Sequence, residues 1–182
     1  MTKLELFHLK STWGNYAFDY ACSMARGRSG GQISMWDPNI FVKRDIWCDN
    51  SFVIVKGQWK ILVGDYFMIN IYDPQDSSEK DLLWRHIEDF MHHNNGAFVL
   101  FGDFNEVCFN YKRLGSSFYQ TQADNFNNFI INNDLIELPI GSRLFTWTNK
   151  AGTKLSKLDY FLLSDNVIEA LPDAQVTNLD NL

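Results

Sequence analysis

A short apolar run at Ala97–Phe101 (AFVLF) constrains the fold of this chain more than any other segment. The run has no polar alternation, which is typical of a strand that is buried on both faces of a sheet. A helical pattern precedes it between Asp81 and Asn95, where apolar residues recur at steps of three and four. A helix that leads into such a strand predicts an α/β fold in which helices cover a sheet.

Other segments predict further elements of the same fold class. Four strands are expected where β-branched and aromatic residues gather between turn signals: Ser51–Lys56, Asp65–Tyr72, Leu144–Thr148 and Asp159–Leu163. A second helix is expected at Gln122–Asn133, and Ser78 with Asp81 resembles a capping box for the first helix. Because the chain has 182 residues and no internal repeat or linker, one domain over residues 1–182 is expected.

Composition bears on the class of function. Hydrophobic residues make up 46% of the chain and charged residues 21%, which fits a folded protein and argues against a disordered tail. The net charge of -6 argues against DNA as a partner, because DNA-binding domains usually present a basic face. A divalent metal held by clustered carboxylates would weaken this objection, since it reverses the local charge that a phosphate meets. The aromatic share of 15% favours a dense core first and stacking on nucleic-acid bases second.

The cysteines and the N-terminus bear on the compartment. Cys22, Cys48 and Cys108 are odd in number and widely spaced, so we expect reduced core thiols and neither a disulfide framework nor a metal site. No stretch approaches the run of about 20 apolar residues that a membrane span needs. The N-terminal residues also lack the form of a signal peptide, so an intracellular protein without a membrane partner is expected.

The sequence Gly102-Asp103-Phe104-Asn105 directly follows the buried run and is the most informative spot for function. A strand that ends in glycine delivers the next side chains to the rim of the sheet, where ligand sites of α/β proteins collect. Asp103 and Asn105 are two residues apart, so in an extended segment they point the same way. Asp103 can then orient or deprotonate a water, and Asn105 can donate to a phosphate oxygen. The same residues also fit a plain turn that is closed by an Asx hydrogen bond.

Two further polar sets complete an ordered series of motifs. Asn70–Gln75 (NIYDPQ) precedes the Gly-Asp-Phe-Asn segment, and Lys157–Ser164 (KLDYFLLS) follows it. This series resembles the ordered motifs of the endonuclease/exonuclease/phosphatase superfamily. Within that superfamily, the chain looks most like the endonuclease domain of plant LINE-type (non-LTR) retrotransposons, and the resemblance spans nearly the whole chain. Three further segments carry this narrower resemblance: Arg26–Gly31, Arg113–Ser117 and Thr146–Asp159.

The resemblance implies a fold, a reaction and a partner. The fold would be a DNase I-like, four-layer sandwich of two packed mixed β-sheets flanked by helices. The reaction would be magnesium-assisted hydrolysis of a phosphodiester, with DNA as partner, a nuclear location and a monomeric protein. Two other interpretations stay open: a noncatalytic remnant that binds nucleic acid or protein, and a relative that acts on phospholipid or inositol phosphate headgroups.

The resemblance also implies roles for single residues. Asp103 corresponds to a water-activating aspartate, Asn105 to the residue that fixes the scissile phosphate, and Tyr72 to a tyrosine that meets a non-bridging oxygen. Gln75 stands where relatives place an amide side chain near the same phosphate. Asp159 corresponds to an aspartate that orients a catalytic histidine, because a carboxylate holds the imidazole tautomer and stabilises the imidazolium.

Further side chains are expected to contact the substrate. Asn70 belongs to the first polar set. Arg28 fits either a contact with the DNA backbone or a tight turn into a strand, and Trp147 fits either a base stack or core packing. Lys112 and Arg113 are additional candidates for contacts with the DNA backbone.

The match with the family breaks at both ends of the chain and at one internal position. The family's metal-binding Glu would fall where Met1 stands, and the chain stops at Leu182, just before a Ser-Asp-His motif. The resemblance therefore implies a domain truncated at both ends, with an incomplete magnesium site and negligible nuclease activity. Asp73 stands where relatives commonly have a small residue, and it is expected to be a solvated turn residue.

Overall fold

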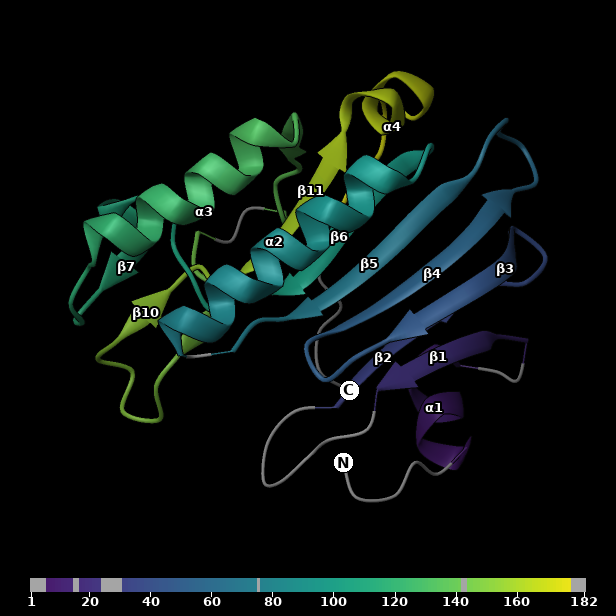
Figure 1. Cartoon of the computed structure of the whole chain (residues 1–182). Coiled ribbons are helices and arrows are strands. Elements are labelled where there is room, and N and C mark those ends of the chain that lie inside the picture. Colours follow the sequence, from purple (N-terminus) through teal and green to yellow (C-terminus); the bar gives the residue numbers. More distant parts are fainter. Residues whose placement is uncertain (1–5, 15–16, 24–30, 75, 142–143, 178–182) are drawn as a thin grey trace.

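The computed structural model describes residues 6–14, 17–23, 31–74, 76–141 and 144–177. Its centre is a six-stranded mixed sheet (Figure 1). In order across the sheet, its strands are β3 (Phe41–Cys48), β4 (Phe52–Trp59), β5 (Tyr66–Tyr72), β6 (Ala97–Asp103), β11 (Asp159–Ser164) and β8 (Leu135–Glu137). Strands β5 and β6 are parallel, and every other neighbouring pair in this sheet is antiparallel.

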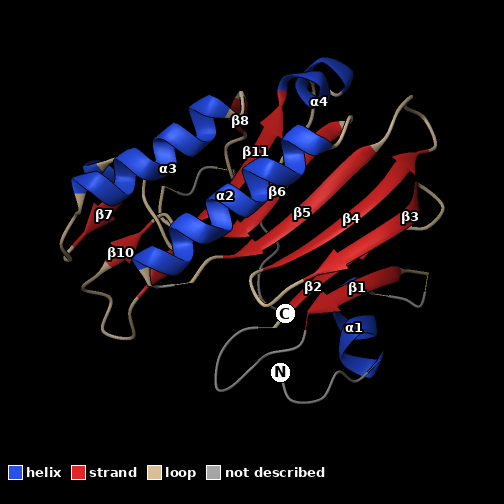
Figure 2. Cartoon of the chain, viewed as in Figure 1, coloured by secondary structure: helices blue, strands red, loops and turns tan. Residues whose placement is uncertain are grey.

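Helices and two smaller sheets flank the six-stranded sheet (Figure 2). The helices are α1 (Leu6–Trp13), α2 (Ser77–His93), α3 (Gln120–Asn132) and α4 (Asp165–Ala170), with a 3-10 turn η1 (Asn110–Lys112). A two-stranded sheet pairs β1 (Asp19–Ser23) with β2 (Gln32–Trp36). A three-stranded sheet contains, in order, β7 (Arg113–Leu114), β10 (Leu155–Ser156) and β9 (Trp147–Thr148).

Strand β4 shows how both faces of the central sheet are covered. Phe52 and Ile54 pack into a cluster with the apolar residues of α2 and α3, whereas Val53 and Val55 pack on the opposite face with residues of β1 and β3. All four side chains are buried, because the strand lies between a helix layer and a second sheet. The expected α/β fold with packed sheets and helices is confirmed, and among the described residues the second sheet consists of β1 and β2.

Helix α2 begins earlier than its apolar pattern predicts. Its N-cap is Asp76, whose carboxylate accepts the backbone N–H groups of Ser78 at 3.0 Å and Glu79 at 3.3 Å. The predicted capping box of Ser78 and Asp81 is therefore wrong, because Asp76 already satisfies the first free N–H groups. Helix α3 agrees with its predicted range to within two residues at the start. No helix in the described part of the chain is long and apolar enough to cross a membrane.

The three cysteines are free, but they do not share one environment. Cys108 is buried, Cys22 is half-buried and Cys48 is exposed. The expectation of a core thiol is correct for Cys108 and wrong for Cys48, which lies at the end of an edge strand where one side of the backbone faces solvent.

Candidate active site

Three of the predicted site residues lie in one row across the six-stranded sheet. Tyr72 ends β5, Asp103 ends β6 and Asp159 begins β11, and the strand register pairs Asp103 with each of the other two. Because β5 and β6 are parallel, their carboxyl ends meet at one edge, and antiparallel β11 starts at that same edge (Figure 1). Strand pairing therefore brings together residues that are far apart in the chain.

Buried aromatic neighbours determine the face on which the two carboxylates lie. Phe104 and Tyr160 follow Asp103 and Asp159 in the chain, and both rings are fully buried on the helix side, with centroids 5.7 Å apart. Successive side chains of a strand point to opposite faces, so Asp103 and Asp159 point away from the helices.

A tight turn after β6 brings Asn105 to the same edge. Asp103 Oδ1 accepts the backbone N–H of Asn105 at 2.9 Å, which is the Asx hydrogen bond that the sequence suggests. Asn105 has a φ of 46°, so the assumption of an extended segment is wrong here. Asparagine tolerates this left-handed conformation better than most residues. Its Nδ2 donates to the backbone carbonyl of Asp73 at 2.7 Å, which leaves Oδ1 and a second N–H for a ligand.

These side chains line a groove of about 390 Å³, here called the strand-end groove. Its lining residues are Tyr72, Asp103, Asn105, Arg113, Ser116, Trp147, Lys154, Ser156 and Leu158. One wall is the edge of the six-stranded sheet, and the other is the three-stranded sheet, which carries Arg113 on β7 and Trp147 on β9. The groove therefore combines carboxylate, amide and phenol groups on one wall with cations and an indole on the other.

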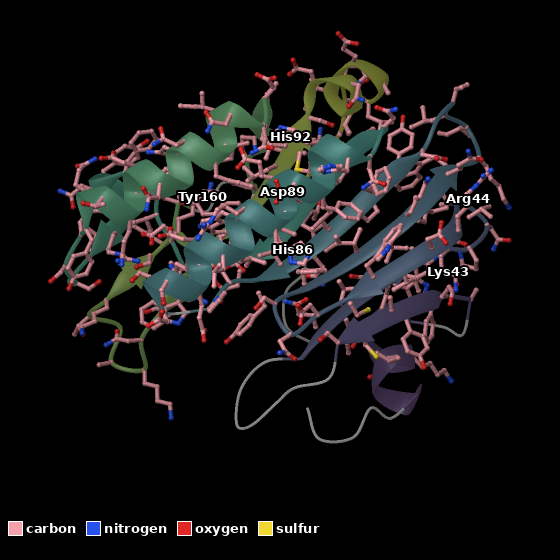
Figure 3. All side chains as sticks on the ribbon, viewed as in Figure 1. Lys43, Arg44, His86, Asp89, His92 and Tyr160 are labelled. Carbon is pink, nitrogen blue, oxygen red and sulfur yellow. The ribbon has the colours of Figure 1, made fainter. Side chains whose placement is uncertain are left out.

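Asp159 stands beside the groove and does not line it. Its own backbone N–H and that of the preceding residue donate to Thr146 Oγ1, at 3.0 and 2.9 Å. Burial raises the pKa of Asp159, although a side-chain hydrogen bond with Thr146 lowers it. The histidines whose side chains the structure describes are His86, His92 and His93; all belong to α2 and none lines the groove. Figure 3 labels His86 and His92 on that helix. A histidine for Asp159 to orient is therefore not among them.

The residues expected to contact substrate are not all brought to the groove. Trp147 lines it with 43% of its surface exposed, so the core-packing interpretation is wrong. Asn70 does not line it, because its Nδ2 donates to the Ile33 carbonyl of β2 at 3.2 Å and thereby joins the two sheets. Gln75 and Arg28 lie outside the described residues.

Among the described residues, the cations that line the groove are Arg113 and Lys154, and the sequence pointed to Arg113. Arg113 lines it as expected, whereas the predicted DNA contact of neighbouring Lys112 is wrong, because its Nζ is buried 2.9 Å from Glu137 Oε2. Lys154 was not anticipated and also lines the groove. The sequence carried no clear signal for it, because neighbouring Ser156, which lies in the same groove, was not predicted as a site residue either.

Asp103 combines partial burial with a second carboxylate nearby. Burial raises its pKa, the backbone hydrogen bond from Asn105 lowers it, and the Asp159 carboxylate raises it. A carboxylate with a raised pKa is a better proton acceptor than one in bulk water, as long as it stays ionised. The position and the pKa shift of Asp103 therefore suit a group that accepts a proton from water.

The magnesium ion implied by the resemblance needs more ligands than these residues offer. Asp103 and Asp159 carry hard oxygens of the kind that magnesium prefers. Among the described residues, however, no group of three or more His, Cys, Asp or Glu side chains is arranged to hold a metal ion. The residues present therefore do not fit a complete magnesium site, and no chemical step is assigned to a metal.

Asp73 is not the solvated turn residue that the sequence predicts. Its N–H donates to the Asp103 carbonyl at 2.8 Å, which extends the pairing of β5 with β6 by one residue. Alternation then directs the Asp73 side chain to the helix side, where it is 0% exposed and lies 3.7 Å from Lys80 Nζ. Burial raises the pKa of Asp73 to about 8, because lost hydration outweighs the attraction of the Lys80 ammonium.

Asp73→Asn is expected to stabilise the chain at mildly alkaline pH. In the unfolded chain this carboxyl ionises near pH 3.9, and in the folded chain near 8. The folded state therefore binds more protons between these values, and the free energy of unfolding falls as pH rises through that window. Asparagine keeps the shape and does not titrate, so we expect a gain on the order of 2 kcal/mol at about pH 8.5, vanishing towards pH 4. Urea unfolding at several pH values measures this, and a gain independent of pH would contradict it.

Comparisons with known proteins support the fold. No protein-family model matches the chain, and no curated protein matches its sequence. Solved structures do match it. The endonuclease domain of TRAS1, a telomere-specific non-LTR retrotransposon, aligns with a TM-score of 0.61 and 15% sequence identity, over 90% of this chain and 80% of that domain.

Two enzymes from other organisms align similarly. A 3′ phosphatase from Neisseria, bound to a product DNA hairpin, has a TM-score of 0.63 and 14% identity, over 90% of this chain and 72% of its own. An AP endonuclease from Leishmania major has a TM-score of 0.60 and 12% identity, over 91% of this chain and 68% of its own. An endonuclease/exonuclease/phosphatase family protein from Bacteroides thetaiotaomicron also aligns, with a TM-score of 0.50 and 14% identity, over 87% of this chain and 63% of its own. The likeness confirms the DNase I-like α/β architecture.

Proposed function

We propose that the strand-end groove binds the phosphodiester backbone of DNA, and that the chain is related to magnesium-dependent endonucleases like that of plant LINE-type retrotransposons. The observation that carries this proposal is the row of Tyr72, Asp103 and Asp159 across three strands, with the Asn105 turn beside it. These polar groups converge at a strand-end edge, which is where α/β folds bind ligands. Structural neighbours that include a DNA-bound phosphatase and an AP endonuclease support DNA as the substrate class.

The groove offers complementary groups to a nucleic-acid strand. The chain has a net charge of -6, which repels the phosphates of DNA. Arg113 and Lys154 provide positive charge in the groove that attracts them. The Tyr72 hydroxyl and the remaining N–H of Asn105 donate to non-bridging phosphate oxygens. The exposed ring of Trp147 provides a surface on which a base stacks.

Asp103 is placed to orient an attacking water. Its Oδ1 accepts the Asn105 N–H, which leaves Oδ2 for a water in the groove. Proton transfer by one positioned side chain contributes about 10²- to 10⁴-fold to a rate. Since the described residues complete neither a metal site nor a histidine acid, we propose that these residues bind DNA and hydrolyse it negligibly.

Replacing both groove cations tests this proposal. We expect the wild-type chain to bind a short labelled DNA duplex at low salt. Arg113→Ala/Lys154→Ala should weaken binding at least about tenfold and reduce the slope of log affinity against log salt by about two, because each phosphate contact contributes close to one. Fluorescence anisotropy at several salt concentrations measures both quantities. Lys60→Ala, at an exposed lysine after β4, is the matched control and should change neither.

Several results would contradict parts of the proposal. Unchanged binding by the double variant would mean that the groove does not hold DNA. Stronger competition by inositol phosphate or phospholipid headgroups than by unlabelled duplex would assign the groove to another phosphoester. Nicking of supercoiled plasmid that needs magnesium and disappears in Asp103→Ala would show that hydrolysis is not negligible.

A further inference from the structure

A buried group of charged side chains lies next to the strand-end groove, between the turn after β6 and helix α2. Lys80 is 6% exposed, Glu106 is 3% exposed and Asp73 is fully buried. Lys80 Nζ lies 2.7 Å from the backbone carbonyl oxygen of Asn105, 3.1 Å from Glu106 Oε2 and 3.7 Å from Asp73 Oδ2. The buried ammonium therefore donates to the backbone of a residue that lines the groove.

Lys80 occupies a position that packing alone would give to an apolar residue. Helix α2 buries Leu83, Trp84 and Ile87 on its inner face, and Lys80 continues this stripe by one turn. A buried ammonium loses several kcal/mol of hydration and gives net stability only when its partners compensate fully. An apolar side chain of similar length would fill the same space without that cost. The polar contacts of Lys80 are therefore what distinguishes it from a packing residue.

The conformation of Asn105 explains what those contacts achieve. A φ of 46° costs some free energy in any non-glycine residue, although less in asparagine than in most, and hydrogen bonds to the surroundings favour it. Three hydrogen bonds do so: the N–H donates to Asp103, the carbonyl accepts from Lys80, and Nδ2 donates to the Asp73 carbonyl. Two of the three are charge-assisted, namely the bond from the Lys80 ammonium at 2.7 Å and the bond to the Asp103 carboxylate at 2.9 Å, and only the bond from Lys80 holds the carbonyl.

We propose that Lys80 is a positioning residue for the phosphate site, because its ammonium holds the Asn105 carbonyl and so fixes the direction of the Asn105 amide in the groove. This inference rests on the proposed function, since it takes Asn105 as a phosphate ligand. The Glu106 carboxylate holds the ammonium from another side. Lys80 does not line the groove, so it acts through Asn105 and touches no substrate.

The test removes the ammonium without leaving a buried charge unpaired. Lys80→Met alone would strand the Glu106 carboxylate and could unfold the chain, so Lys80→Met/Glu106→Gln is the main variant and Glu106→Gln its reference. We expect the Asn105 backbone amide to exchange with deuterium at least about tenfold faster in the double variant, as measured by NMR. Its affinity for the labelled duplex should fall by about five- to tenfold, and Lys80→Arg should lose less.

A control variant separates this effect from the general loss of an ion pair. Lys56→Met removes the Lys56–Asp65 pair, which joins atoms 2.9 Å apart near the opposite end of β5. It should change neither the exchange of Asn105 nor the affinity for DNA. Matched urea unfolding of all variants gives the global stability against which local exchange is compared.

The two readouts keep the two possible failures apart. Unchanged exchange at Asn105 in the double variant would overturn the inference, whatever the affinity. Faster exchange with unchanged affinity, in a chain that binds DNA, would also overturn it, because the position of Asn105 would then not matter for phosphate. A wild-type chain that binds no DNA would overturn the proposed function and, with it, the role of Lys80 in phosphate binding. Faster exchange at Asn105 would then show only that Lys80 stabilises the Asn105 backbone.

Discussion

Gly102→Ala is expected to lower the free energy of unfolding by at least about 3 kcal/mol, or to prevent folding. Gly102 has a φ of 125°, which L-residues rarely adopt. A Cβ at this position would lie 2.1 Å from the Ile71 carbonyl oxygen and 3.0 Å from Asn70 Oδ1. The carbonyl belongs to the backbone of β5, so relief requires separating β5 from β6 where Ile71 is paired with Gly102, one residue before the pair of Tyr72 and Asp103.

Gly152→Ala is the matched control for this prediction. Gly152 also has a positive φ, of 68°, but a Cβ there would meet no atom within 4 Å. Its replacement should therefore cost only the intrinsic penalty of the left-handed conformation, about 1 to 2 kcal/mol. Urea unfolding followed by circular dichroism measures both variants. Equal losses would mean that steric contact with β5 is not what requires glycine at position 102.

The part of the site that follows strand periodicity was predictable from sequence. The apolar run before Gly102 indicates a buried strand, and the residues after it reach the sheet edge, as observed. The family resemblance assigned Tyr72 and Asp159 to the same site as Asp103. The observed register pairs each of them with Asp103. Sequence periodicity could not give that pairing, because it depends on which strands are neighbours.

The buried charged group of Asp73, Lys80 and Glu106 was not predictable in the same way. Asp73 follows a strand and precedes a proline, a context that usually indicates a solvated turn. The hydrogen bond from the Asp73 N–H to the Asp103 carbonyl continues the pairing of β5 with β6. It directs the Asp73 side chain towards the helices, where it is buried. Lys80 gave a signal that could have been used, since it falls on the apolar stripe of its helix four residues before Trp84. Its partner Glu106 lies in the loop after β6, so the ion pair becomes apparent only in the three-dimensional structure.

Strands β1, β2 and β3 were also missed, and β3 shows one reason. β3 has the sequence FVKRDIWC and buries only its first residue, Phe41, so neither apolar alternation nor a continuous apolar run marks it. It is an edge strand, and charged residues such as Lys43 and Arg44 on an edge hinder pairing with other chains (Figure 3). Its strand-favouring residues are interrupted by the charged residues 43–45, and pairing with β4 is what completes the strand.

Phe104→Ala is the second large effect that we expect, with a loss of about 3 to 5 kcal/mol in the free energy of unfolding. The Phe104 side chain is fully buried, and its ring centroid lies 5.8 Å from that of Trp84, 5.4 Å from Phe126 and 5.7 Å from Tyr160. These rings come from α2, α3 and β11, so the cavity left by alanine would be bounded by elements that cannot all move inward.

The position of Phe104 between Asp103 and Asn105 gives this variant a second consequence. Anchoring of the ring in the core is what directs the two neighbours outward, so alanine should also weaken DNA binding under conditions in which the variant remains folded. Phe109→Ala is the control, because Phe109 is 48% exposed and its loss should cost less than about 1 kcal/mol. Urea unfolding and anisotropy measure the two effects. A Phe104→Ala variant that is destabilised but binds DNA as the wild type does would mean that the backbone hydrogen bonds of Asp103 and Asn105 orient the groove without help from the aromatic core.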